Sequence, residues 1–411
     1  MENELKVFIK RYESVMAPLR REAADTYFKA SVTGDEALYK KAGECEVAIS
    51  KIYARKDDFA FLKKAKEAGS VKDGLLKREL EVLYDSYLVY QGDEKKIEEI
   101  KNKEMEVTQK FSVFRAEYKG KKITDNEVNK VLRESKDSGD LKEVWESHKS
   151  IGKLVAGDVL ALVKLRNELA VSLDFKNYHE MQLLTNEQDP KEISSLFDEL
   201  AELTKDVFLA EKKEIDRFLA KKFCINEAEL MPWHYGDRYF QEAPEILKLD
   251  LNKYFKDADP VKITIGFFKG LGLEIEDIIA NSDLYEKPGK NQHAYCMDVD
   301  KAGDIRVLCN VKPDFYWMNT MLHEFGHAVY DKYLEKSLPY VLRSPAHIFT
   351  TEAVAMFFGR LASEPQWLKD VMGITESEKD GIKMDCFRHL KLNQLVFSSW
   401  SQVMYRFEKS L

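Results

Sequence analysis

Hydrophobic residues between positions 159 and 173 recur at the spacing of an α-helix, with charged residues between them. The apolar set is Leu160, Val163, Leu165, Leu169 and Leu173. This is the pattern of a helix that turns one face toward a core. The chain also has no proline from residue 19 to residue 189. Because proline removes a backbone donor and clashes with the preceding helical turn, this interval predicts a series of long helices.

Two β-prone runs interrupt the helical pattern in the second half of the chain. They are His293–Asp298 and Ile305–Val311, and the segment between them contains Gly303, a residue suited to a turn. We therefore expect one small antiparallel hairpin here. The fold class predicted from the whole pattern is mainly α with this single small sheet.

Residues typical of helix ends predict where several of the helices begin and end. Thr124 and Glu127 form a capping-box sequence that opens one helix. Pro313–Asp314 precedes a long helix predicted over residues 315–335, which Leu338–Pro339 ends. Ser344–Pro345 offers an N-cap followed by proline at the first helical position, so a second helix is predicted from there to about Ala362.

Composition excludes several classes of protein. The 411 residues carry a net charge of −8, which argues against a nucleic-acid partner because phosphates require a basic face. No apolar run approaches the ~18 residues of a membrane span, and the first residues do not resemble a secretory signal. The five cysteines are scattered without a CxxC pair, which favours a reducing compartment. We therefore expect a soluble, cytoplasmic protein without a membrane partner.

The candidate chemistry lies in the sequence His323-Glu324-Phe325-Gly326-His327, an HExxH motif within the helix 315–335. Residues four apart share a helix face, so both imidazoles can reach one metal ion. Glu324 is displaced around the helix and can act on a water without being a ligand. Chance would give on the order of 0.01 such motifs in a chain of this composition. The alternative is a pair of surface histidines on an amphipathic helix.

A catalytic zinc ion usually has three protein ligands and an open fourth position. Glu352 lies 25 residues after His327, on the second predicted helix, between apolar neighbours. A single glutamate on a helix is commonly just solvated, but the upstream HExxH motif favours a ligand. The sequence therefore predicts one Zn²⁺ per chain held by His323, His327 and Glu352, with Glu324 as general base.

These motifs resemble those of gluzincin oligopeptidases. HEFGHAVY with the downstream TTEA is similar to the zinc motif of peptidase family M3, the thimet oligopeptidase and oligoendopeptidase F family, and of its relative M2, the angiotensin-converting enzyme family. His293-Ala294 resembles the His-Ala pair on the substrate-aligning edge strand of the converting-enzyme branch. Val163–Leu183 resembles the N-terminal lobe of these enzymes.

The resemblance implies a mainly α, two-lobed zincin peptidase fold with a deep cleft and a small antiparallel β element beside the zinc helix. An N-terminal helical lobe would cover residues 1–180 and a catalytic lobe residues 181–411. His293 and Ala294 would bind substrate. The implied activity is zinc-dependent hydrolysis of short peptides, of oligopeptidase or peptidyl-dipeptidase type, and the choice between these types stays open.

One departure from these families concerns the oxyanion. Their stabilising histidine and tyrosines lie further downstream than this chain extends, and beyond Glu352 it contains only His389 and Tyr405. We interpret both as structural residues. The expectation is that the C-terminal part of the catalytic lobe is missing. The alternative function is therefore a catalytically impaired zinc- and peptide-binding protein, or one that needs a C-terminal fragment as partner.

The residues that orient the zinc histidines are not assigned by the sequence. Metal-bound histidines normally donate their second ring nitrogen to a carboxylate or a carbonyl. Met356 stands where the converting-enzyme branch has an aspartate, so the partner of His323 is unassigned, and Asp331, four residues after His327, is one candidate.

Overall fold

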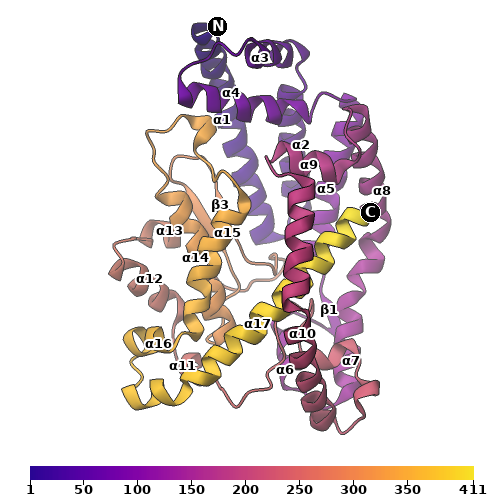
Figure 1. Cartoon of the computed structure of the whole chain (residues 1–411), viewed down its shortest axis with the longest axis vertical. Coiled ribbons are helices and arrows are strands. Elements are labelled where there is room, and N and C mark those ends of the chain that lie inside the picture. The colour runs from indigo at the N-terminus through magenta and orange to yellow at the C-terminus, as the bar shows by residue number, and fades with distance from the viewer. The chain divides into compact units, whose positions relative to one another are not determined.

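The computed structural model describes residues 1–411 and is mostly helical, with two small antiparallel sheets of two strands each (Figure 1). The predicted mainly α class is confirmed. The sequence reasoning expected one sheet and missed the hairpin of β1 (Ala116–Tyr118) and β2 (Lys121–Ile123). Its two turn residues, Lys119 and Gly120, both have positive φ, at 50° and 74°. That conformation matches the twist of a two-residue hairpin.

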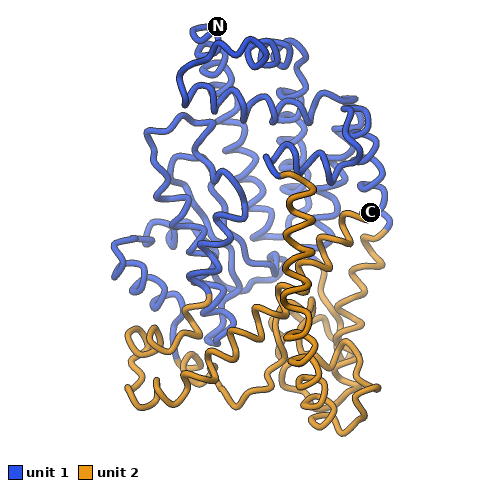
Figure 2. The backbone as a smooth tube through the Cα atoms, viewed as in Figure 1, with its two compact units in different colours: residues 1–113, 157–188, 258–359 blue, residues 114–156, 189–257, 360–411 orange.

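The chain packs into two compact units, each assembled from three separate stretches (Figure 2). Unit 1 comprises residues 1–113, 157–188 and 258–359, and unit 2 comprises residues 114–156, 189–257 and 360–411. These units are defined by which residues pack together. The predicted division at residue 180 is a different one, between the N-terminal and catalytic lobes of a peptidase. That division stays a prediction.

Unit 1 contains the β3–β4 hairpin and most of the long N-terminal helices. Its helices and strands are α1 (Glu2–Thr33), α2 (Glu36–Tyr53), α3 (Lys56–Ala68), α4 (Gly74–Leu88), α5 (Glu94–Val113), most of α8 (Ile151–Ser172), α9 (Tyr178–Thr185), α12 (Pro260–Gly270), α13 (Glu276–Asn281), β3 (Tyr295–Asp298), β4 (Ile305–Leu308), α14 (Phe315–Lys332) and α15 (Ile348–Gly359). A buried cluster of residues from α1 to α4 forms much of its core, and it includes Leu5, Met16, Leu62, Leu83 and Tyr87.

Unit 2 is built on two helices of more than thirty residues. Its elements are the β1–β2 hairpin, α6 (Asp125–Glu134), α7 (Ser138–Lys149), α10 (Pro190–Phe223), α11 (Asn252–Phe255), α16 (Pro365–Met372) and α17 (Glu376–Ser410). Its buried cluster combines α6, α7, α10 and α17, and it includes Val128, Leu141, Val144, Leu219 and Leu392.

The predicted helix-start signals at Thr124 and Asp314 are confirmed. The Thr124 backbone N–H donates to the Glu127 carboxylate at 2.7 Å, and Glu127 N–H donates back to the Thr124 hydroxyl at 3.3 Å, which is a reciprocal capping box. Asp314 accepts a hydrogen bond from the backbone N–H of Trp317 at 2.8 Å and thereby caps α14.

Several predicted boundaries are wrong. Helix α15 begins at Ile348, not directly after Ser344–Pro345, and its first turn forms on the carbonyl of His347, which accepts from the N–H of Thr350 at 3.1 Å. After Gly359 the chain tightens into a 3₁₀ turn over Arg360–Ser363. The hairpin strands are also shorter than expected, and His293 and Ala294 lie just before β3. Tyr295 is the first residue paired with β4, opposite Leu308.

None of the helices combines the length and apolar character that a membrane span requires. The cytoplasmic location stays a prediction.

Candidate metal centre

The site depends on the close packing of α14 against α15, which lie side by side in unit 1 (Figure 1). A Cβ atom at Gly326 of the HExxH motif would lie 2.8 Å from Ala355 Cα. A Cβ atom at Gly359 would lie 3.3 Å from the Cβ of His323. The absence of both side chains therefore lets the two helix backbones approach closely and brings Glu352 within reach of the histidines.

The three predicted ligands converge. His323 Nε2 and His327 Nε2 each lie 3.5 Å from the same carboxylate oxygen of Glu352, and the donor atoms of all three residues lie within 4.8 Å of one another. Tetrahedral zinc with ligand bonds of about 2.1 Å separates its ligand atoms by about 3.4 Å. The separations of 3.5 Å are longer than a good hydrogen bond and match this spacing.

The second ring nitrogen of His327 has a partner that the sequence reasoning missed. His327 Nδ1 lies 2.8 Å from the hydroxyl of Thr351, which is buried. This contact orients the ring so that Nε2 faces Glu352. Asp331, the sequence candidate for the partner of His323, makes no hydrogen bond with either histidine. Nothing in a single sequence indicates that the hydroxyl of Thr351, one residue before Glu352, contacts a metal-binding histidine.

Charges at the site are arranged to keep one imidazole neutral and the carboxylate ionised. Burial and the neighbouring His327 lower the pKa of His323 to about 4. The nearby polar ring of His327 lowers the pKa of Glu352. Burial acts to lower the pKa of His327, but the adjacent Glu352 carboxylate outweighs it and raises that pKa. A neutral imidazole and an ionised carboxylate are the forms that bind a metal.

Glu324 lies under strand β3. Its side chain is only 7% exposed, and it accepts a hydrogen bond from the backbone N–H of Cys296 in β3. Burial raises the pKa of Glu324 to about 7. The contact with Cys296 thus joins the carboxylate of the HExxH motif to the strand that follows His293 and Ala294.

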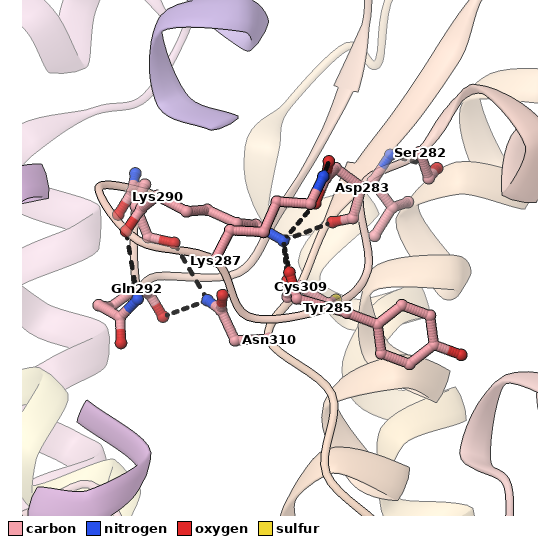
Figure 3. A network of polar contacts seen from close by, with 10 residues as sticks. Ser282, Asp283, Tyr285, Lys287, Lys290, Gln292, Cys309 and Asn310 are labelled. Carbon is pink, nitrogen blue, oxygen red and sulfur yellow. Dashed lines mark hydrogen bonds and ion pairs between the residues drawn. The ribbon is translucent and has the colours of Figure 1, made fainter. Parts of the chain in front are cut away.

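A network of polar contacts centred on Lys290 lies directly before His293 and Ala294 in the chain (Figure 3). The Lys290 ammonium is fully buried and donates to the Asp283 carboxylate at 2.7 Å, to the Tyr285 carbonyl at 2.7 Å and to the Cys309 carbonyl. Asn310, which follows Cys309, donates to the Gln292 carbonyl at 3.2 Å. The network therefore ties the end of β4 to the segment that enters β3.

His293 is exposed beside the metal centre, and its charge contributes to the low pKa of His323. The remaining candidates, His389 and Tyr405, both lie on α17 in unit 2. Within that unit the Tyr405 hydroxyl lies 2.9 Å from Ser194 Oγ, and its ring packs 4.8 Å from that of Phe197. The His389 ring lies 3.2 Å from Asn393 Nδ2.

Two family profiles match the chain. The profile of peptidase family M3 matches residues 279–410, which contain all the residues of the candidate centre. The profile of the M2 family, angiotensin-converting enzyme, matches residues 1–235, more than half of the chain. The chain belongs to the metallopeptidases of the M2/M3 type. This peptidase combines an M2-like N-terminal half with an M3-like segment that carries the HExxH motif. No curated protein matches it.

Proposed function

We propose that this peptidase is zinc-dependent and hydrolyses peptide bonds of short peptides, with His323, His327 and Glu352 as ligands and Glu324 as general base. The observation that carries the proposal is the convergence of two imidazole nitrogens on one carboxylate oxygen at 3.5 Å each. The buried Glu324 adjoins this group on the same helix.

The donor set fits zinc. Two imidazoles and one carboxylate form the ligand set of many catalytic zinc sites, in which the fourth position stays open. His323 and Glu352 are already in the forms that bind a metal, whereas His327, whose pKa Glu352 raises, would give up a proton on binding. When bound, zinc supplies Lewis-acid chemistry, since it lowers the pKa of a coordinated water toward ~7 and polarises a carbonyl.

Glu324 would act as general base and then as general acid. From its place under β3 it would accept a proton from the attacking water and deliver it to the departing amine nitrogen. The backbone N–H of Cys296 hydrogen-bonds to this carboxylate and holds it in place relative to the strand. Preorganisation of this kind lowers the cost of reaching the transition state.

His293, Ala294 and the strand they enter would align the substrate. Strand β3 pairs with β4 along one edge in a sheet of only two strands. An extended peptide can add to such an edge through main-chain hydrogen bonds. The exposed His293 lies at the entrance to this edge, where it can contact the bound peptide.

The test measures zinc and turnover together. The full chain should contain one zinc per molecule by elemental analysis and should cleave a quenched fluorescent peptide. Glu324→Gln should keep the zinc and lose nearly all hydrolysis. Glu335→Gln is the matched control, because Glu335 is exposed beyond the end of α14. Full activity of Glu324→Gln with zinc in place would refute the general-base role.

Product analysis by mass spectrometry separates the two modes of cleavage. Release of C-terminal dipeptides identifies a peptidyl-dipeptidase, and cleavage at internal bonds identifies an oligopeptidase. A chain that binds zinc and peptide but produces no fragments is instead the catalytically impaired binding protein of the alternative hypothesis.

A further inference from the structure

Unit 1 contains a second feature suited to a ligand, a cavity of about 300 Å³ among α1, the end of α2, α4, α9 and the loop before α15. None of the metal-centre residues lines it. We propose that this cavity binds a small zwitterion, a free amino acid or a very short peptide, through Arg20 and Asp85. Volumes of this size are at the lower end of those of small-molecule sites.

Two of the charged side chains on the cavity wall neutralise each other. Arg78 and Glu187 form a two-pronged ion pair, in which Arg78 Nη2 lies 2.7 Å from Glu187 Oε2. A bidentate guanidinium–carboxylate pair satisfies both partners well. The charges left for a ligand are therefore those of Arg20 and Asp85.

Arg20 has most of its hydrogen-bonding capacity unused. Its guanidinium makes one hydrogen bond, from Nη2 to the Tyr53 hydroxyl at 3.1 Å, and forms no ion pair with a carboxylate within 4 Å. A guanidinium has five N–H donors, arranged to fit a carboxylate with two parallel bonds. A ligand carboxylate at the cavity would use donors that the protein leaves open.

Asp85 is the complementary acceptor. Its carboxylate is 23% exposed and lies 3.8 Å from the ammonium of Lys66, and the charge of Arg78 also acts on it, but no hydrogen bond from a cation reaches it. Burial raises the pKa of Asp85. A ligand ammonium would satisfy this carboxylate, since a half-buried carboxylate gains from a hydrogen-bonded cation.

One part of the cavity wall is apolar and aromatic, beside polar residues such as Ser86, Gln182 and Thr185. Tyr53 and Tyr90 stack with their ring centroids 5.3 Å apart, and Val82 and Val89 line the same cavity. This surface suits an apolar side chain. The combination of Arg20, Asp85 and this wall therefore favours amino acids such as phenylalanine over simple anions. Dipeptides and other very short peptides are zwitterions of the same kind, and if the proposed function holds, the chain's own reaction would release them.

The first experiment needs only the unaltered protein. Isothermal titration calorimetry compares L-phenylalanine with phenylalaninamide, which lacks the carboxylate, and with N-acetylphenylalanine, which lacks the ammonium. We expect the two derivatives to bind at least tenfold more weakly. Equal binding of all three, or no binding of phenylalanine at millimolar concentration, overturns the proposal.

The second experiment locates the site. Arg20→Gln and Asp85→Asn should each weaken phenylalanine binding at least tenfold, with circular dichroism confirming that the variants are folded. Arg21→Gln, which changes an exposed neighbour on the same helix, should bind normally. Binding should also survive EDTA. Loss of binding on metal removal, or normal binding by Arg20→Gln, would place phenylalanine elsewhere and overturn the proposal.

Discussion

His327 Nδ1 lies 2.8 Å from the hydroxyl of Thr351, the residue directly before Glu352. One turn of α15 therefore supplies both the carboxylate that faces the imidazole Nε2 atoms and the group that fixes the orientation of one imidazole ring. If α15 shifts relative to α14, both contacts change together, so the geometry of the centre depends on a single helix pair.

Thr351→Val should weaken zinc binding while leaving the ligand set intact. The substitution keeps the shape of the side chain but removes the oxygen that holds His327. Loss of such a contact usually reduces metal affinity about 10- to 100-fold. Competition with a chromophoric chelator measures the affinity. Thr350→Val, one residue earlier in the same turn, is the control and should bind zinc normally. An unchanged affinity in Thr351→Val would show that the hydroxyl does not orient the ring.

Gly326→Ala should disrupt the centre from outside the ligand set. The added Cβ would lie 2.8 Å from a backbone atom of Ala355, so α15 has to move. Overpacking of this kind costs about 1–3 kcal/mol of stability, and we expect zinc affinity and peptide hydrolysis to fall with it. Gly157→Ala in α8 is the matched control, because its Cβ would meet nothing within 4 Å. That variant should keep both properties and gain stability, since alanine favours helix. Normal zinc binding by Gly326→Ala would contradict the close-packing argument.

The ligand positions could be predicted from sequence because they depend on local rules. His323 and His327 share a face by helix periodicity alone, and α14 begins at a capping signal that needs no distant partner. The start of α15 could not be predicted in this way, since Ser344 and Pro345 form an N-terminal signal that the chain does not use. Thr351 was missed for a related reason: its role arises only when two helices pack, and no spacing along one chain records that contact.

Lys290→Met should destabilise unit 1 strongly. The substitution leaves the Asp283 carboxylate and the carbonyls of Asp283, Tyr285 and Cys309 without their buried donor. Breaking a buried ion pair costs about 3–5 kcal/mol. Lys287→Met is a close control, because Lys287 also pairs with Asp283 but its side chain is 52% exposed. Exposed pairs contribute about 0–1 kcal/mol. Urea denaturation of both variants measures the difference. Equal free energies of unfolding would show that the network in Figure 3 does not stabilise the entry to β3.

Glu79 should make the stability of the protein depend on pH near neutrality. Its side chain is 6% exposed in α4, and burial, with the charges of Glu13 and Asp73, raises its pKa from 4.5 to about 7. Below about pH 4.5 the group is protonated in both the folded and the unfolded state. As the pH rises toward 7 the unfolded state loses the proton first, so the folded state loses stability relative to it.

Glu79→Gln removes this ionisation. Relative to the unaltered protein, the variant should therefore be more stable at pH 8 than at pH 5. A pKa difference of this size corresponds to at most about 3 kcal/mol between the two conditions. Urea denaturation of both proteins at pH 5 and pH 8 gives the comparison, and the pH 5 measurement controls for any change in packing caused by the amide. If the stability difference between the two proteins is the same at both pH values, Glu79 is ionised in the folded state at pH 5 and the burial argument fails.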